Sequence, residues 1–456
     1  MIEKRYCNRE IETMSREELL TYQWGLLQDQ IRYTYENSGL CKQQFEKAKI
    51  TPDDIKTRED FIHKVPFTTK QDLVADQQES PPYGTRLVVP ENKIFITYLT
   101  SGTSGKGQEV HTDTKETWDT VLDFITMNFT WAGWQEGDSA MNILPIGVTE
   151  AAPAIYLAMI RVGCNVFNLG MYDTKTKLDF MSRFKISNID VTPPYLETLT
   201  YEAEKLGLDP SRDLAARKIM ISMSSWPISF IHKMEEKWNA KIADNYGTTQ
   251  SANGCTCENG AVIGDQRGYY HLYEHFAVHE VIDPETGEPV GPGEMGEMVA
   301  TPLNKKASPF LRFRLGDRVR YFPHDTCDCG RPFSLLEAGT ITRYDDMVKV
   351  KGVSIWPQTI DEIVLTKGEI VEYQGRVCIT DDKREMVGIT VEFKEGVSPD
   401  ERKQLLSQIS SDIRDTTGVK FDVQEASKAL PQYIAKASSL RWVDERIKGL
   451  ERKTMG

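Results

Sequence analysis

Short apolar runs and amphipathic segments alternate along the middle of the chain, from about residue 94 to 250. Runs such as IFITYL, SAMNILPI and KIMISM have the length and composition of buried strands. Segments such as APAIYLAMIRVG and SFIHKMEEKWN have the apolar periodicity of helices. Strands that alternate with helices favour parallel pairing, because each helix carries the chain back across the sheet. This region is therefore predicted to be α/β with a largely parallel sheet.

The chain on either side of this region has a different pattern. Before it, Ser15-Arg-Glu-Glu18 has the spacing of a capping box, so residues 15–47 are predicted to be helical. After it, strand-like runs separated by Gly and Pro predict a β-rich subdomain at about residues 260–335. The order strand pair, helix, two strands and long helix then indicates a compact α+β domain. We expect an N-terminal domain over residues 1–344 and a C-terminal domain over residues 345–456.

The composition is that of a globular protein, and its charge limits the partners. Hydrophobic residues make up 39% and charged residues 27% of the 456 residues, and the formal net charge is −13. An acidic chain repels phosphate backbones, which argues against nucleic-acid binding but permits a local basic pocket. The sequence has no apolar run of about 18 residues, the length of a membrane helix, and its start MIEKRYCNREIE lacks the apolar run of a signal peptide. We therefore expect a cytoplasmic protein without a membrane partner.

The segment Tyr98-Leu-Thr-Ser-Gly-Thr-Ser-Gly-Lys-Gly107 follows an apolar strand and is the strongest local signal of chemistry. Small residues let backbone N–H groups curl around an anion, and the Ser and Thr hydroxyls add donors. Lys106 adds positive charge. The spacing differs from that of the P-loop of NTPases, G-x-x-x-x-G-K-[ST]. Taken alone, the segment is equally compatible with a Ser/Gly-rich surface loop.

Four further segments follow the loop in order: Asp244-Asn-Tyr-Gly-Thr-Thr-Gln250, Phe313-Arg-Leu-Gly-Asp317, Thr342-Arg-Tyr-Asp-Asp346 and Pro431-Gln-Tyr-Ile-Ala-Lys436. Together they resemble the ordered motifs of the adenylate-forming enzymes, the superfamily of acyl-CoA synthetases, peptide-synthetase adenylation domains and luciferases. The chain length and segments such as KVPFTTKQDL and DDMVKVKGVSIWPQTIDEIV resemble its phenylacetate–CoA ligase branch. Each motif alone could be an ordinary turn, and the joint order is what favours the family.

The resemblance implies an AMP-forming carboxylate–CoA ligase, which adenylates an aryl acid with ATP and then transfers the acyl group to coenzyme A. It implies that Tyr246 stacks on adenine, Thr249 contacts the α-phosphate and Asp317 binds the ribose. The whole implied nucleotide site comprises Ser101, Gly102, Thr103, Ser104, Gly105, Lys106, Asn245, Tyr246, Gly247, Thr248, Thr249, Gln250, Asp317 and Arg343. It also implies a mobile C-terminal domain with its hinge at Asp345. Lys436, which acts with Thr249 as a catalytic residue, would neutralise charge as the acid meets the α-phosphorus.

Three positions depart from the family's motifs. Gln250 stands where the family has a glutamate that helps to hold Mg²⁺, and an amide oxygen is a weaker ligand for a hard cation. Mg²⁺ remains an expected cofactor, because ATP and water supply other ligands. Thr342 replaces the glycine that usually precedes Arg343, and Gly107 stands where a proline is common. Two alternatives stay open: an adenylyltransferase of the coenzyme F390 synthetase type, and a non-catalytic nucleotide-binding homologue.

Four of the eight cysteines form two C-x-C pairs. In a reducing compartment such spacing indicates metal binding rather than disulfides, with four reduced thiols as the alternative. Some members of the resembled branch carry a Cys/His zinc site in this region. By that likeness, a structural Zn²⁺ would be held by Cys257, His271, Cys327 and Cys329, with Cys255 as the alternative ligand. The net charge of −13 argues against a zinc-dependent nucleic-acid module.

The family places the acyl pocket in segments before the adenine motif, which here contain Ile146, Tyr195 and Trp226. A small and aromatic lining suits a planar aryl acid, while Tyr195 and Trp226 are equally suited to a hydrophobic core. The expected partners are a small carboxylic acid, ATP and coenzyme A, and a homodimer is left open.

Overall fold

The computed structural model describes residues 3–100, 108–344, 347–350, 353–379, 385–430 and 441–446. Three predicted features lie outside these ranges: the phosphate-loop residues 101–106, the hinge Asp345 and the catalytic Lys436. The chain divides into two compact units, Met1–Met223 with Ile231–Ile341, and Ser224–Phe230 with Thr342–Gly456. Each unit has a hydrophobic core of its own.

The larger unit is built on one mixed sheet with the strand order β12-β13-β14-β15-β11-β8-β7-β6-β5-β3-β4. The parallel strands are β3 (Ser139–Asn142), β4 (Asn165–Asn168), β5 (Asn188–Val191), β6 (Lys218–Ser222) and β7 (Lys241–Thr248). The antiparallel strands are β8 (Ser251–Thr256), β11 (Tyr269–Leu272), β12 (Ala277–Ile282), β13 (Met295–Pro302), β14 (Phe313–Phe322) and β15 (Leu335–Glu337). A short hairpin joins β9 (Val262–Ile263) to β10 (Gln266–Arg267). The predicted α/β class with a parallel part and a β-rich part is confirmed.

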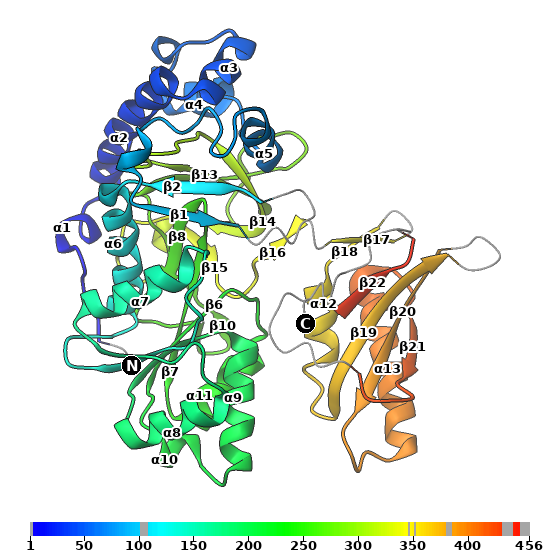
Figure 1. Cartoon of the computed structure of the whole chain (residues 1–456). Helices are drawn as coiled ribbons and strands as arrows, with labels where there is room; N and C mark the ends of the chain where they lie inside the picture. Colours follow the sequence, from blue (N-terminus) through cyan, green and yellow to red (C-terminus); the bar gives the residue numbers. More distant parts are fainter. Residues whose placement is uncertain are drawn as a thin grey trace. The chain divides into compact units, whose positions relative to one another are not determined.

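Helices connect the parallel strands, and Figure 1 shows α8, α9 and α11 grouped beside them. In chain order these helices are α7 (Ala151–Val162), α8 (Thr174–Phe184), α9 (Pro193–Lys205), α10 (Pro210–Asp213) and α11 (Ile228–Trp238). α9 begins at a proline, whose fixed φ and missing N–H suit the first helical position. α7 ends at Gly163, which adopts the left-handed conformation (φ 94°) that favours glycine.

The N-terminal helices are α1 (Arg9–Glu12), α2 (Arg16–Asn37), α3 (Gly39–Ala48), α4 (Arg58–Lys64), α5 (Lys70–Glu79) and α6 (Lys115–Trp131). The capping box predicted at Ser15 and Glu18 is present at the start of α2. The helix predicted over residues 15–47 is interrupted at Ser38, which has an extended backbone. The Ser38 hydroxyl accepts the N–H of Cys41 at 3.3 Å and so starts a second helix.

The predicted strand IFITYL forms β1 (Ile96–Leu99), but this strand is not part of the parallel sheet. It pairs with β2 (Val110–Asp113) in a separate antiparallel sheet of two strands. Backbone hydrogen bonding continues past the strand end, where the N–H of Thr100 donates to the carbonyl of Glu109 at 3.1 Å. The buried Tyr98 hydroxyl donates to Asp113 at 2.6 Å, and Lys305 donates to the same carboxylate at 3.0 Å. Local pairing and this buried ion pair therefore fix the hairpin.

Aromatic side chains form much of the core of the larger unit. Trp131, Trp134 and Phe129, at and just beyond the end of α6, are at most 1% exposed. They belong to one buried cluster with Met220 and Ala243 of the sheet. Complete burial of a large apolar side chain contributes about 1.5–3 kcal/mol, so this cluster is a principal support of α6 on the sheet.

The smaller unit has a four-stranded sheet in the order β21-β20-β19-β22. Its elements are β16 (Thr342–Arg343), β17 (Val348–Val350), β18 (Val353–Ile355), α12 (Pro357–Val364), β19 (Ile370–Ile379), β20 (Glu385–Phe393), α13 (Pro399–Thr417), β21 (Asp422–Glu425) and β22 (Trp442–Asp444). α13 begins at Ser398, whose hydroxyl accepts from the N–H of Glu401, and ends at the left-handed Gly418. The buried side chains Tyr373, Ile409 and Trp442 join the sheet to the helices in one cluster.

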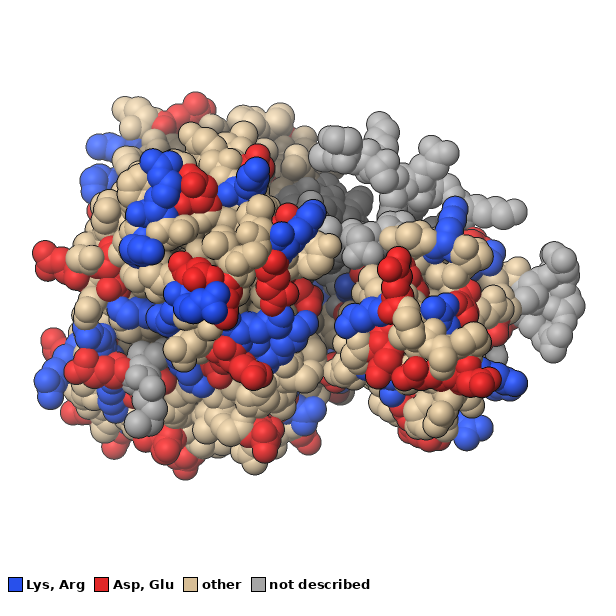
Figure 2. Space-filling model, turned by 90° about the horizontal axis from the view of Figure 1, so that it is seen from below, with Lys and Arg blue, Asp and Glu red and all other residues tan. Residues whose placement is uncertain are grey.

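Charges at the surface are mixed in sign. Figure 2 shows Lys and Arg side chains interspersed with Asp and Glu on the face seen from below. Typical pairs are Lys115 with Asp119 at 2.7 Å and Arg183 with Asp179 at 3.1 Å, each one helical turn apart. Exposed pairs of this kind contribute about 0.3–0.5 kcal/mol each. Among the described helices, none combines the length and the apolar character needed to cross a membrane.

The smaller unit offers a test of its core packing at Gly375. A Cβ atom at this position would lie 2.5 Å from the indole of Trp442, whereas a Cβ at Gly368 in the same unit would meet no atom within 4 Å. We predict that Gly375→Ala displaces Trp442 and destabilises this unit by about 1–3 kcal/mol. Hydrogen exchange should therefore accelerate in β19 and β22. Gly368→Ala is the matched control, and equal exchange in the two variants would contradict the prediction.

Candidate active site

The motif Asp244–Gln250 lies at the carboxyl end of β7, where the sheet changes from parallel to antiparallel pairing. β7 runs parallel to β6 on one side and antiparallel to β8 on the other. The turn between β7 and β8 is closed by the hydroxyl of Thr248, which accepts the N–H of Ser251 at 3.3 Å. In open α/β sheets, ligands bind beyond the carboxyl ends of the parallel strands. The motif is therefore positioned for ligand binding by the sheet itself.

The structure brings together two residues that the sequence predicted to bind adenine and ribose. The hydroxyl of Tyr246 donates a hydrogen bond of 2.6 Å to the carboxylate of Asp317, 71 residues further along the chain. Both side chains are buried, with Tyr246 9% and Asp317 3% exposed. A phenol ring and a fixed carboxylate in contact present a flat apolar surface beside an acceptor for hydroxyl groups. That combination suits a nucleoside.

A bulge in β14 places Asp317 in this contact. Glu297 of β13 pairs with Arg318 and Val299 pairs with Arg314, so the register of the two strands shifts between these pairs. The bulged stretch contains Gly316 at φ 74°, a conformation that favours glycine. The backbone conformation therefore favours glycine at position 316, and the aspartate that follows it makes the contact with Tyr246.

Glu109 joins the neck of the predicted phosphate loop to the adenine motif. Its carboxylate accepts hydrogen bonds from Gln250 at 2.6 Å and from the Nε2 of His111 at 2.9 Å. Lys70 lies 3.6 Å away. Burial by itself would raise the pKa of Glu109, but the hydrogen bonds from His111 and Gln250, with the charge of Lys70, bring it below its usual value. Burial and the nearby Arg86 lower the pKa of His111 to about 4, so its imidazole is neutral at pH 7.

The remaining predicted nucleotide residues occupy varied positions. The Asn245 side chain donates to the Ile221 carbonyl at the end of β6 at 3.4 Å, while Gly247, Thr248, Thr249 and Gln250 follow at the end of β7 and in its turn. Arg343 belongs to β16 of the smaller unit. The loop residues Ser101, Gly102, Thr103, Ser104, Gly105 and Lys106 fall outside the described part of the chain.

The three predicted acyl-pocket residues have different environments. Ile146 is 45% exposed, in the irregular segment that follows β3, and Trp226 is 2% exposed. The hydroxyl of Tyr195 is within hydrogen-bond distance of Thr174 (3.1 Å) and accepts from Lys177 (3.2 Å), both on α8. The Lys177 ammonium also lies 5.0 Å from the centre of the Tyr195 ring. Tyr195 therefore joins α8 to α9, a role sufficient to explain its identity.

The residues predicted to bind zinc converge in a buried cluster. The candidate ligand atoms of Cys257, His271, Cys327 and Cys329 all lie within 4.8 Å of one another. The Sγ atoms of Cys257 and Cys327 are 3.8 Å apart, and the Nε2 of His271 is 3.1 Å from the Sγ of Cys329. Sulfur atoms in a tetrahedron with zinc–sulfur bonds of about 2.3 Å would be separated by about 3.8 Å. The donor set and its spacing therefore fit Zn²⁺.

The proposed alternative ligand, Cys255, lies outside this group. It is fully buried in the aromatic core, and its Sγ donates to the carbonyl of Thr256 at 3.2 Å and contacts that of Asn128 at 3.9 Å. Within the cluster, hydrogen bonds among the thiols lower the pKa of Cys329 and raise that of Cys257. Of the two C-x-C candidates near residue 256, Cys257 is the one that lies in the cluster.

A buried arginine connects the cluster to the start of the chain. Arg331, 1% exposed, donates to Glu12 at 3.1 Å and to Glu258 at 2.6 Å. Its guanidinium lies 4.4 Å from the centre of the Trp131 ring. Lys4 donates to the carbonyl of Cys329. These contacts hold the turn that carries two of the four candidate ligands.

Asp190 is an ionisable residue that the sequence analysis did not single out. It lies near the carboxyl end of β5 and is 2% exposed, and within the described part of the chain no side chain donates a hydrogen bond to its carboxylate. Burial raises its pKa to about 7. The Asp within the apolar run NIDV was the sequence feature that could have indicated a buried carboxyl group. Only the structure shows that both faces of β5 are covered.

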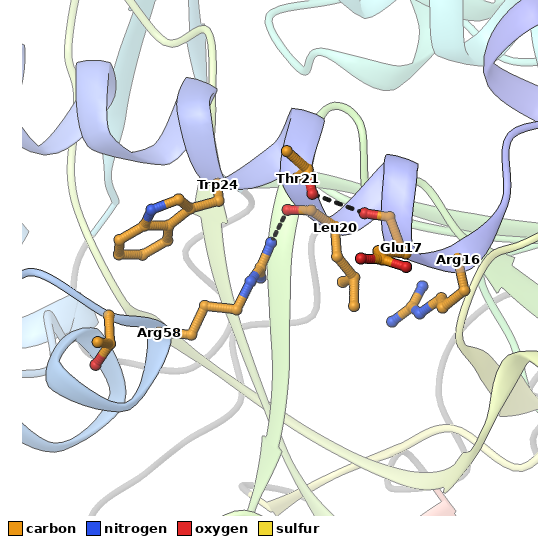
Figure 3. Close-up of a pocket in the computed structure, with 7 residues that line it drawn as sticks. Arg16, Glu17, Leu20, Thr21, Trp24 and Arg58 are labelled. Carbon is orange, nitrogen blue, oxygen red and sulfur yellow. Dashed lines mark hydrogen bonds between the residues drawn. The ribbon is translucent and has the colours of Figure 1, made fainter.

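A surface groove elsewhere on the larger unit shares no residue with this site. It is lined by residues of α2 and α4 with Thr57 (Figure 3), namely Arg16, Glu17, Leu20, Thr21, Trp24, Thr57 and Arg58. Arg58 donates to the Leu20 carbonyl and to Gln23 at 2.7 Å, while Arg16 pairs with Glu274. Both cations are therefore engaged within the protein.

The mixed sheet and the α+β unit are those of the adenylate-forming enzyme fold. The chain belongs to the AMP-binding enzyme family: residues 25–301 match the family model described as AMP-binding enzyme, and residues 352–446 match its C-terminal domain. The branch predicted from the motifs is confirmed, since curated relatives are phenylacetate–coenzyme A ligases. The enzyme of Aromatoleum evansii is 28% identical over 96% of this chain and 97% of its own, and that of Pseudomonas putida is 28% identical over 91% of each.

Solved structures share the fold. A crystal structure of 2-hydroxyisobutyryl-CoA ligase in the postadenylation state with 2-HIB-AMP has a TM-score of 0.83 at 22% identity, covering 96% of this chain and 92% of that one. The same ligase with 2-HIB-AMP and CoA in the thioesterification state has a TM-score of 0.69 at 22% identity, covering 95% and 91%.

Asp190 makes stability depend on pH in a direction opposite to that of a salt-bridged carboxylate. Its pKa is about 7 in the folded chain and about 3.9 in an unfolded one. Between these values the unfolded chain releases a proton that the folded chain retains, so rising pH destabilises the fold. We compare the free energy of unfolding of Asp190→Asn with that of the wild type at each pH. We predict that the difference, variant minus wild type, is about 2–3 kcal/mol higher at pH 8 than at pH 5.

Unfolding curves of the two proteins at both pH values would measure this difference. Asp179→Asn, which changes an exposed carboxylate of α8, is the control and should show no such dependence. An equal effect of Asp190→Asn at both pH values would mean that the Asp190 carboxyl ionises normally in the fold.

Proposed function

We propose that this chain is an AMP-forming ligase that joins a carboxylic acid to coenzyme A. The observation that carries the proposal is the contact between Tyr246 and Asp317 at the carboxyl edge of the sheet, where two motifs distant in sequence meet. Matches to both AMP-binding family models and similarity to phenylacetate–coenzyme A ligases over nearly the whole chain support it.

The proposed reaction has two steps. In the first, an oxygen of the acid attacks the α-phosphorus of ATP and pyrophosphate leaves. In the second, the thiol of coenzyme A attacks the acyl carbon, AMP leaves with the bonding electron pair and the thiol proton passes to solvent. Because the first step brings two anions together, the enzyme must supply positive charge and alignment. We assign the charge to Lys106 and Lys436, contact with the α-phosphate to Thr249, and nucleoside binding to Tyr246 and Asp317.

We further propose an aromatic acid as the substrate class. Phenylacetate–coenzyme A ligases are 28% identical to the chain over nearly its whole length, whereas the 2-hydroxyisobutyryl-CoA ligase is 22% identical. Ile146 and Trp226 remain the proposed lining, and Tyr195 would contribute its ring only from within the α8–α9 contact. ATP and Mg²⁺ are the proposed cofactors of the first step. Arg343 is assigned to nucleotide binding, and Asp345 is assigned to the hinge of the domain movement between the steps.

The test is a pyrophosphate-release screen of aromatic and aliphatic acids with ATP, Mg²⁺ and coenzyme A. We predict release that depends on an aromatic acid, and AMP formation that coenzyme A accelerates. Lys436→Ala should raise the adenylation barrier by about 3–4 kcal/mol while leaving thioester formation from supplied acyl-adenylate much less affected. Acid-dependent release without an effect of coenzyme A would exclude the transfer step. ATP binding without turnover on any acid would instead support a non-catalytic homologue.

We propose a structural zinc ion at Cys257, His271, Cys327 and Cys329. We predict roughly one zinc per chain in the purified protein, measured by inductively coupled plasma mass spectrometry. Cys329→Ser should lose the metal and lower the unfolding temperature, because three remaining ligands leave the buried site incomplete. The control is Cys164→Ser, which alters a buried thiol outside the cluster. Zinc absent from the wild-type protein, or retained in full by Cys329→Ser, would refute the site.

A further inference from the structure

Glu109 and Gln250 form a link between the two chain segments that flank the proposed nucleotide site. Glu109 follows the phosphate loop by two positions, and Gln250 follows Thr249 in the turn after β7. The amide of Gln250 donates to Glu109 Oε2 at 2.6 Å across 141 residues of sequence. The backbone of Glu109 is fixed as well, since its N–H donates to the Thr100 hydroxyl at 3.0 Å. The carboxylate therefore has a defined position at the neck of the loop.

The two oxygens of this carboxylate differ in their surroundings. Oε2 accepts both from Gln250 and from the neutral imidazole of His111. Within the described part of the chain, Oε1 faces the ammonium of Lys70 at 3.6 Å, which is beyond hydrogen-bond distance. The side chain is only 2% exposed, so its negative charge is weakly screened by solvent. Oε1 is consequently the oxygen with free capacity for a ligand.

Lys70 forms an ion pair with Oε1 at 3.6 Å, but one ammonium cannot balance both this carboxylate and a triphosphate, so the two anions conflict unless a further cation lies between them. A triphosphate held by the loop would bring several negative oxygens near the Glu109 carboxylate, and like charges in a poorly screened site repel strongly. A divalent cation removes the conflict, because Mg²⁺ binds through one or two carboxylates together with substrate phosphates and water. The side chain of Gln250 is a neutral amide and offers no carboxylate to Mg²⁺. Its N–H group instead donates a hydrogen bond to the carboxylate of Glu109.

We propose that Glu109 is the protein's carboxylate ligand for the divalent cation that accompanies ATP, and that Gln250 is the positioning residue that orients it. This inference rests on the proposed ATP-dependent function. The Glu109–Gln250 pair carries one negative charge, and in this chain Glu109 is the member that carries it. Because the two side chains are hydrogen-bonded, a glutamate at either position would bring a carboxylate to nearly the same place.

ATP binding measured by isothermal titration calorimetry with EDTA and with Mg²⁺ tests the assignment without turnover. In the wild-type protein, Mg²⁺ should tighten ATP binding. Glu109→Gln should reduce this enhancement about tenfold, while ATP binding in EDTA stays equal or becomes tighter because a repelling anion is gone. The double variant Glu109→Gln with Gln250→Glu, which moves the carboxylate to the other member of the pair, should regain the enhancement.

The matched control is Glu204→Gln, an exposed carboxylate of α9 paired with Lys237, and it should bind ATP like the wild type under both conditions. An unchanged Mg²⁺ enhancement in Glu109→Gln would overturn the assignment and leave the proposed function intact. Failure of the wild-type protein to bind ATP at all would overturn the proposed function and this inference together.

Circular dichroism and thermal unfolding would show whether Glu109→Gln folds. If it does not, Gln250→Glu alone carries the test. A second carboxylate beside Glu109 should weaken ATP binding in EDTA and increase the enhancement by Mg²⁺. No change in either quantity would overturn the assignment.

Discussion

The hydrogen bonding of β7 is the constraint on which the rest of the larger unit depends. Parallel pairing with β6 brings the carboxyl end of β7 to the edge where ligands bind, and antiparallel pairing with β8 returns the chain at once. Tyr246 lies in β7, and β8 ends one residue before Cys257. The proposed nucleotide site and the candidate metal site therefore both take residues from this one hairpin and its end. A slip of one position in this register would turn the side chains of both to the opposite face.

Buried charges are a second organising element. Arg312 forms two hydrogen bonds with Glu280, Lys305 pairs with Asp113, and Arg331 bridges two glutamates. Such pairs contribute little net stability, because removal of both ions from water offsets their attraction, yet separation of the partners is strongly unfavourable. They therefore favour one arrangement of the elements over its alternatives. Asp190 differs from them, because it is buried and no Lys or Arg among the described residues forms an ion pair or hydrogen bond with its carboxylate.

Local sequence signals predicted the features that local physics determines. The capping box at Ser15, the helix that ends before Gly163 and the ordered family motifs are all read from neighbouring residues. The break at Ser38 also has a local cause, the cap from its hydroxyl to Cys41, which the prediction missed. The pairing of β1 with β2 and the contact of Glu109 with Gln250 depend instead on partners that lie further along the chain. The cysteine cluster was predictable as a set only through the resemblance to the family, and the separation of Cys255 from it required the packing of α6 against β8.

The clamp formed by Lys4, Glu12 and Arg331 has a consequence for biosynthesis. Glu12 is joined to Arg331, which lies 319 positions later in the sequence. After Glu12 is made, the ribosome must add these positions before the contact can form, so Glu12 lacks this partner during most of the synthesis of the larger unit. Chains that terminate before Arg331 would leave Glu12 and Trp131 without this shared partner.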